Sequence, residues 1–237
     1  MIAQGCEGAR CTPTPLKQAR TCTIVPRDQR VEDRQGIMLT VRIHGRGGQG
    51  VVTAAELLST AAFADGKHAL AFPSFGSERM GAPVMAFCRI DTGAIRTREA
   101  VTHPDVLIVQ DPTLLHQVEL FAGLAPEGYV LINSTFSVDD LNIGEVLKSL
   151  PSDHVCVVPA SDIGMKHMRR PIANTPLLGA FAAMTGVIEL ASVQSAMRQK
   201  FPGALGEANA AAAQDGYDHV IASLAPEGSG VHHARAN

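Results

Sequence analysis

The 237-residue sequence contains no tryptophan and only two tyrosines. It also contains no apolar run that approaches the ~20 residues needed to cross a bilayer. Neither sign of charge is in large excess, because 20 lysines and arginines face 23 aspartates and glutamates, for a formal net charge of −3. Such a chain has no bulk electrostatic attraction to nucleic acid or to anionic lipid. The composition therefore argues against a nucleic-acid partner and against a membrane.

The cysteines exclude further classes of protein. There are five, an odd number with uneven spacing, and the N-terminus lacks the apolar stretch of a secretory signal, so a disulfide-stabilised secreted domain is not indicated. No Cys-x-x-Cys pair of the kind that holds iron–sulfur clusters is present. Cys6, Cys11 and Cys22 could share a metal ion, but free thiols are the favoured interpretation. Cys88 lies in an apolar strand, where a buried, inert thiol is expected. We expect a cytoplasmic protein without a metal site of its own.

Hydrophobic residues make up 46% of the chain and glycine contributes 22 residues, which suits a compact α/β domain with helices packed closely on a sheet. Residues 1–37 lack apolar periodicity and are predicted to form an N-terminal extension, or arm. Translation from Met38, directly before the first strand, is the alternative. Residues 38–225 are predicted to form one domain, and the Gly/Pro-rich residues 226–237 a flexible C-terminal tail.

Short apolar runs alternate with longer amphipathic segments along this domain. The predicted strands are 39–44, 68–72, 84–90, 105–111, 129–133 and 153–160. The predicted helices are 51–66, 113–121, 142–150, 175–184, 189–200 and 206–224. A hairpin is expected to join residues 84–90 to residues 94–97. Alternating strands and helices imply an α/β fold with a doubly wound, mainly parallel sheet and flanking helices.

The segment between the first strand and the first helix carries the strongest functional signal. It is a GxGxxG pattern made of Gly45, Arg46, Gly47, Gly48, Gln49 and Gly50. Glycines in this position allow a tight turn and close approach to a ligand, and free amides at the start of the helix favour phosphate. The alternative is a tight turn that binds nothing. His44, directly before the motif, could touch a phosphate, although a lone histidine at a strand end is more often structural.

The expected ligand is not a nicotinamide dinucleotide. A site for that cofactor normally has an aspartate or glutamate ~20 residues further on, at the end of the second strand, to hold the ribose. Here the second strand ends in "HALAFPSF" with no acid, and Lys67 precedes it. Arg46 adds a positive charge within the loop. A different phosphate-bearing ligand is therefore favoured.

Two further segments are candidates for a functional role. The connection after the second strand contains Phe75, Gly76, Glu78 and Arg79, and ordered loops of this length are often functional. A solvated surface loop is the alternative. Asp111 ends the strand at 105–111, where it either faces a cleft at the carboxyl ends of the strands or caps the next helix.

Several ordered motifs resemble one known family. They are "VRIHGRGGQGVVTAAELL" from Val41, "PSFGSERMGAPVMAFCRI" from Pro73, "HPDVLIVQDPTLL" from His103, "NTPLLGAFAAMTG" from Asn174 and "EANAAAAQDGYDHV" from Glu207. In this order they are similar to the γ subunit, or γ domain, of pyruvate:ferredoxin oxidoreductase and its relatives. The resemblance runs from about residue 39 to residue 224, and the arm has no counterpart in it.

The resemblance implies a division of labour between subunits. In this family thiamine diphosphate with Mg²⁺ attacks a 2-oxoacid, [4Fe–4S] clusters carry the electrons to ferredoxin or another acceptor, and coenzyme A removes the acyl group. This sequence has neither a Gly-Asp-Gly segment followed by Asn nor cluster-binding cysteines. The resemblance therefore places those cofactors on thiamine-binding and ferredoxin-type partner subunits, with no catalytic residue in this chain. It implies that this chain packs against the thiamine-binding subunits and helps to form a shared coenzyme A site. Residues 45–50 would hold the phosphates of coenzyme A or make a main-chain contact near the cleft, and Phe75, Gly76, Glu78 and Arg79 would form a subunit contact near the active site.

The substrate within this family stays open. "HGRGGQG" and "ERMGAP" are closer to the pyruvate branch than to the 2-oxoglutarate branch, so pyruvate is favoured. Aryl 2-oxoacids such as phenylglyoxylate or indolepyruvate are the alternative. A stand-alone NAD-dependent oxidoreductase and a purely structural scaffold are the two hypotheses outside the family.

Overall fold

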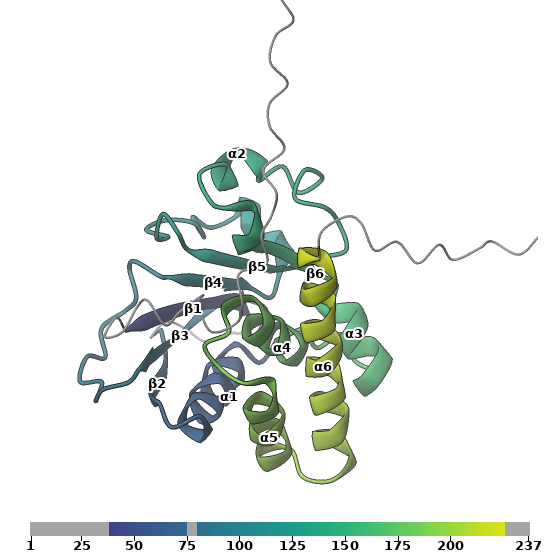
Figure 1. Ribbon diagram of the computed structural model, residues 1–237. Helices are drawn as coiled ribbons and strands as arrows, with labels where there is room; N and C mark the ends of the chain where they lie inside the picture. The colour runs from purple at the N-terminus through teal and green to yellow at the C-terminus, as the bar shows by residue number, and fades with distance from the viewer. Residues whose placement is uncertain (1–37, 75–79, 226–237) are drawn as a thin grey trace, which may run out of the picture.

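The computed structural model describes residues 38–74 and 80–225, and these form a six-stranded sheet with helices packed against it (Figure 1). The strands are β1 (Leu39–Arg46), β2 (His68–Pro73), β3 (Pro83–Asp91), β4 (Val106–Val109), β5 (Tyr129–Asn133) and β6 (Val155–Val158). Their order across the sheet is β2-β3-β1-β4-β5-β6. Strands β1, β4, β5 and β6 are parallel, whereas β3 runs antiparallel to both of its neighbours, β1 and β2. The sheet is therefore mainly parallel, with an antiparallel pair at one side.

Most helices cover one face of this sheet. They are α1 (Val51–Ala64), α3 (Ala160–Met168), α4 (Asn174–Thr185), α5 (Leu190–Lys200) and α6 (Ala204–Leu224). In Figure 1, α1, α4, α5 and α6 lie together on one side of the strands, and the short α2 (Gly144–Leu147) lies on the other. Within the described ranges no helix is both long and apolar enough to cross a membrane.

Alternation along β1 divides the core into two layers. Val41 and Ile43 point toward α1 and are completely buried, together with alanines of that helix. Helix α4 lies at the centre of this layer and is buried on all sides, with Ala183 its one partly exposed residue. It packs closely on α6 because small residues line the contact. A Cβ added to Gly179 of α4 would lie 1.8 Å from the Ala213 carbonyl oxygen, and a Cβ added to Gly216 of α6 would lie 2.1 Å from the Pro176 carbonyl oxygen.

The opposite face is covered by shorter and less regular segments. Its apolar layer joins β4 and β5 to a 3-10 turn, η3 (Pro112–His116), and to α2. Arg42 projects from β1 into this layer and is 7% exposed. Its Nη2 atom donates to the carbonyl oxygens of Leu120 at 2.6 Å and Ala122 at 2.8 Å. The arginine thus holds the segment that follows η3 against the sheet.

The predicted α/β class, with its mainly parallel sheet and flanking helices, is confirmed. The predicted hairpin between 84–90 and 94–97 is wrong, because β3 pairs with β1 and β2 and residues 94–97 form no strand. The expected helix at 113–121 is only η3, and the one at 142–150 is only α2. Helix α3, which has nine residues and Gly164 in its interior, was not predicted. The predicted arm at 1–37 and tail at 226–237 lie outside the described residues.

Candidate ligand-binding site

The glycine motif forms a tight turn from β1 into α1. The amide of Gln49 donates to the carbonyl oxygen of Arg46 at 3.0 Å, which closes the turn. Gly48 and Gly50 have φ values of 94° and 73°, a region that side chains with a Cβ rarely adopt. Close contacts add to this requirement, since a Cβ on Gly50 would lie 2.5 Å from the Asn174 Nδ2 atom. The conformation of the turn therefore requires glycine at positions 48 and 50.

The turn leaves several amides available at the start of α1. The first hydrogen bond of the helix runs from the Ala54 amide to the Gly50 carbonyl oxygen at 2.9 Å, so the amides of Val51, Val52 and Thr53 precede the ladder. The positive end of the helix dipole lies at the same place. A hollow of about 440 Å³ opens here. It is lined by Arg46, Gly47, Gly48, Gly50, Val51, Val52, Thr53, Met80 and Val84. These features favour an anion such as a phosphate group.

The segment before β3 forms one wall of the hollow. Gly47 donates to the Ala82 carbonyl oxygen at 2.9 Å, and Gly81 donates to the Gly47 carbonyl oxygen at 3.1 Å. Met80 is 89% exposed, and its sulfur would lie 2.8 Å from a Cβ on Gly48. The β2–β3 connection thus returns to the glycine loop. Phe75, Gly76, Glu78 and Arg79, predicted as a subunit contact, lie in this connection but outside the described residues.

The guanidinium of Arg46 makes four hydrogen bonds within the protein. Its Nε atom lies 3.1 Å from the Asp111 carboxylate, and its Nη1 atom donates to the Gly81 carbonyl oxygen at 3.1 Å. Its Nη2 atom donates to the Thr113 hydroxyl at 2.7 Å and the Gln117 side chain at 2.9 Å. The sequence suggested a free cation for a ligand. The structure instead uses this arginine to join the loop, the β3 entry and η3.

Asp111, at the carboxyl end of β4, is the acceptor for much of this network. One oxygen accepts from Arg46 Nε and, at 2.7 Å, from Gln49 Nε2. The other accepts from the amide of Thr113 at 3.0 Å and from its hydroxyl at 2.5 Å. Burial alone would raise the pKa of this carboxyl, but the bonds from Thr113 and Gln49 and the charge of Arg46 outweigh it and lower the pKa. Asp111 therefore caps η3, one of its two predicted roles, and also holds the loop.

His44 is a structural residue on the face of the sheet that points away from α1. It follows Arg42 in the strand alternation and is buried, and it is not among the residues that line the hollow. Burial and the nearby charge of Arg42 lower its pKa to about 4. The histidine is therefore neutral at physiological pH.

Buried amide side chains lie behind the loop. Asn174, at the start of α4, donates to the Gly50 carbonyl oxygen at 3.4 Å. Asn133, at the end of β5, donates to the Gln110 carbonyl oxygen and to the Ser161 hydroxyl, each at 2.8 Å. The Asn133 contacts fix the carboxyl ends of β4 and β5 relative to α3, and the Asn174 contact joins the start of α4 to the glycine loop. Sequence reasoning placed Asn133 at a strand end but could not predict its partners.

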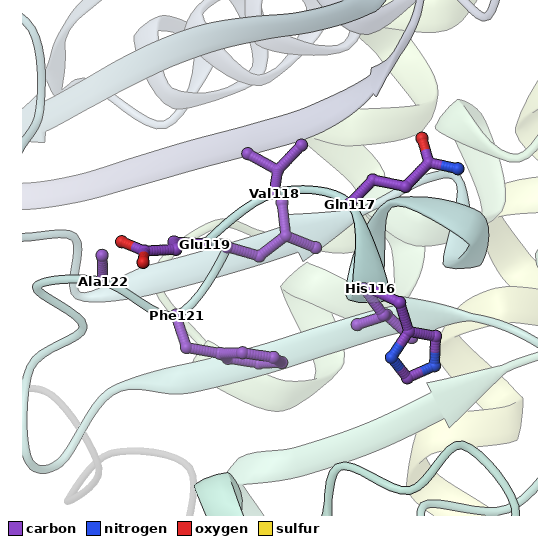
Figure 2. Close-up of a pocket in the computed structure, with 8 residues that line it drawn as sticks. His116, Gln117, Val118, Glu119, Phe121 and Ala122 are labelled. Atoms are coloured by element: carbon purple, nitrogen blue, oxygen red, sulfur yellow. The ribbon is translucent and has the colours of Figure 1, made fainter.

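A second hollow, at residues 115–122, comprises about 490 Å³ but fits a ligand less well, because a single irregular segment forms it. Figure 2 shows its Val118, His116 and Glu119 side chains pointing away from one another. Within 38–74 and 80–225, no three His, Cys, Asp or Glu residues are close enough together to hold a metal ion. Cys88 is completely buried, as expected, and burial raises the pKa of its thiol.

Comparison with known proteins identifies the family. The family model for pyruvate ferredoxin/flavodoxin oxidoreductase matches residues 40–219. The chain belongs to this family. The resemblance that the sequence motifs indicated is therefore confirmed, and residues 1–37 lie outside the matched region.

The similar proteins are small subunits of about the length of the described domain. The common γ subunit of the pyruvate/ketoisovalerate oxidoreductases of Thermococcus kodakarensis is 46% identical over 184 residues, 78% of this chain and 98% of that protein. The pyruvate synthase subunit PorC of Methanothermobacter thermautotrophicus is 45% identical over 77% of this chain and 96% of its own. The crystal structure of pyruvate oxidoreductase subunit PORC from Thermotoga maritima superposes with a TM-score of 0.65 at 36% identity, covering 77% of this chain and 96% of that one.

Proposed function

We propose that this chain is the γ subunit of a thiamine diphosphate- and iron–sulfur-dependent 2-oxoacid oxidoreductase, which converts a 2-oxoacid to its acyl-coenzyme A or runs the reverse reaction. The support is the identity of 45–46% to proteins named as γ or PorC subunits, which the chain matches over nearly their whole length. Pyruvate is the proposed substrate. The Thermococcus relative is named as common to two oxidoreductases, so its γ subunit does not by itself fix the 2-oxoacid. The uneven cysteine spacing supports a cytoplasmic location.

In this proposal the bond-breaking cofactors belong to partner subunits. No metal-binding cluster lies within the described residues, and the buried Cys88 and Cys156 have no cysteine neighbour there. These residues therefore do not fit a Mg²⁺–thiamine diphosphate or a [4Fe–4S] cluster. Thiamine-binding and ferredoxin-type subunits would hold these groups, and ferredoxin or another acceptor would receive the electrons.

The proposed role of the glycine loop is to hold phosphate groups of coenzyme A. The observation that carries this role is the hollow at the start of α1, where the Val51, Val52 and Thr53 amides are not used by the helix. Arg46 is engaged with Asp111, so main-chain amides would supply the recognition. Met80, Val52 and Val84 add apolar surface for the organic part of the ligand. When bound, coenzyme A supplies the thiol that accepts the acyl group.

Strand order argues against the competing hypothesis of a nicotinamide cofactor. Such a site needs the end of the second strand close to the loop, with an acid to hold the ribose. Here β3 lies between β1 and β2, which moves the end of β2 away by one strand. The strand ends at Phe72 and Pro73, neither of which is acidic.

Two experiments test the proposal. Co-purification from the native host, followed by mass spectrometry, is expected to recover thiamine-binding and ferredoxin-type subunits, and a lone monomer would count against the assembly. In the assembled enzyme, Thr53→Phe fills the hollow and is expected to raise the KM for coenzyme A about tenfold, through lost contacts worth roughly 1.4 kcal/mol. The control is Thr60→Phe, an exposed position two turns along the same helix. Unchanged coenzyme A affinity in Thr53→Phe would remove the ligand role.

A further inference from the structure

Asp111 joins the glycine loop to η3, and the family resemblance assigns it no role. We propose that Asp111 is a positioning residue, whose carboxylate fixes the conformation in which the loop amides bind coenzyme A. This inference rests on the proposed function, because it assigns a role in the same ligand site. Asp111 does not line the hollow itself, so it would act through Arg46 and Gln49.

The first argument is that the two carboxylate oxygens of Asp111 bind different segments of the chain. One oxygen accepts from Arg46 and Gln49, which are both loop residues, while the other accepts twice from Thr113 of η3. Bonds of this kind to an ionised group are worth more than neutral ones. Because η3 is packed on β4 and β5 through the buried Leu114, the carboxylate connects a loop without a side-chain cap to a rigid element.

The second argument is that Gln49 passes the constraint to the backbone. Its Oε1 atom accepts from the Arg46 amide at 2.7 Å, while its Nε2 atom is held by Asp111. The Gln49 amide in turn donates to the Arg46 carbonyl oxygen. The orientation of one side chain thus fixes both ends of the turn. No described residue accepts from the amides of Gly48 and Gly50, so these amides remain available for a ligand.

Arg46 extends the same constraint to the opposite wall. It donates to the Gly81 carbonyl oxygen, and Gly81 pairs with Gly47. The distance between the loop and the segment carrying Met80 therefore depends on where Asp111 holds the guanidinium. Both walls of the hollow are set by a residue outside it.

A carboxylate near a phosphate site also has an opposing effect, because its charge repels the ligand. The charge of Arg46, 3.1 Å from the carboxylate, partly offsets this repulsion. The two effects predict opposite changes in coenzyme A affinity when the carboxylate is removed. If geometry dominates, removing the charge weakens coenzyme A binding, and if charge dominates, removal strengthens it.

The test compares Asp111→Asn with Asp111→Glu in the assembled enzyme, with coenzyme A as the probe. Asparagine keeps an oxygen for Thr113 but presents an amide to Arg46 and Gln49, whereas glutamate keeps the charge and displaces it by one methylene. We expect both variants to raise the KM for coenzyme A about tenfold, with the KM for the 2-oxoacid unchanged. The matched controls are the same two substitutions at Asp140, an exposed aspartate that accepts from Ser137 in a similar local cap.

The outcomes separate the two proposals. Tighter binding in Asp111→Asn with no effect in Asp111→Glu, or no effect in either, would overturn the positioning role. If Thr53→Phe weakens coenzyme A binding in that case, the ligand site stands without Asp111; if it also has no effect, both proposals fail. Should Asp111→Asn not assemble, Gln49→Leu removes one loop donor and leaves the η3 cap intact. It is expected to weaken coenzyme A binding severalfold, and an unchanged KM would again overturn the inference.

Discussion

Gly179 of α4 lies directly against the main chain of Ala213 in α6, so that a Cβ on the glycine would fall 1.8 Å from the alanine carbonyl oxygen. Gly179→Ala should therefore force the two helices apart, although alanine is the better helix former. We expect the free energy of unfolding in urea to fall by about 3 kcal/mol.

Gly66→Ala is the matched control for this effect. Gly66 has a φ of 75° but no atom within 4 Å of an added Cβ, so only backbone strain of about 1 kcal/mol is expected. Equal losses in the two variants would contradict steric contact between α4 and α6.

Replacing Arg42 should loosen the second face of the sheet. Arg42→Met leaves the carbonyl oxygen of the buried Leu120 without its donor, and removes the donor to the more exposed Ala122 carbonyl oxygen as well. We expect a loss of about 3 kcal/mol in the free energy of unfolding and faster amide exchange in residues 117–122. Arg96→Met, at an exposed position, should change stability by less than about 0.5 kcal/mol.

Stability should fall in mild acid because of His44. Its pKa is about 4 in the folded state, below the ordinary 6.5, so the unfolded chain binds the proton first as the pH falls. The neutral histidine's contribution is complete above pH 6.5 and is lost as the pH falls toward 4, with about 2 kcal/mol lost between pH 7 and pH 5. His44→Gln should remove that part of the pH dependence of urea unfolding. NMR titration checks the cause, because Arg42→Met should raise the pKa of His44, and a wild-type value near 6.5 would contradict the prediction.

Cys88 should react with a thiol reagent only after unfolding. The thiol is completely buried and its pKa is raised by burial, so thiolate is scarce in the native state. In a background with Cys6, Cys11 and Cys22 replaced by serine, native protein should show almost no absorbance change with a chromogenic disulfide reagent, and urea should release the signal of Cys88 and Cys156. Thr60→Cys on the exposed side of α1 supplies the positive control. Rapid reaction of Cys88 in the native protein would show that the strand opens.

Local patterns in the sequence predicted the strands and helices in which buried residues recur at regular spacing. Alternating or continuous apolar residues marked all six strands, and the spacing of alanine and leucine marked α1 and α4 to α6. Helix α3 escaped because its order depends on distant contacts: the Asp215 carboxylate of α6 accepts from Lys166 at 2.6 Å and lies 2.7 Å from the His167 ring. The hairpin prediction failed because β1 and β2 occupy both edges of β3, which leaves no edge for residues 94–97.

Only the part of the candidate site that is local in sequence was predicted. The glycine spacing is local and was recognised, but the partner of Arg46 is 65 residues away. The parallel register could have revealed it, since His44 lies opposite Val109, and two residues further on Arg46 and Asp111 meet. Once the first and fourth strands are taken as parallel neighbours, the sequence alone places these two charges together.

The position of β3 restricts which changes of length the chain can accept. This strand is bonded on both sides, with Ala86, Cys88 and Ile90 facing the helices and Phe87 and Arg89 facing away. Inserting one residue into it would exchange the two rows and direct a guanidinium into the alanine-rich layer beneath α1. Homologous chains should therefore keep a constant number of residues in β3. A viable insertion or deletion would have to fall in a connection outside the strands, where it leaves both rows of side chains in place.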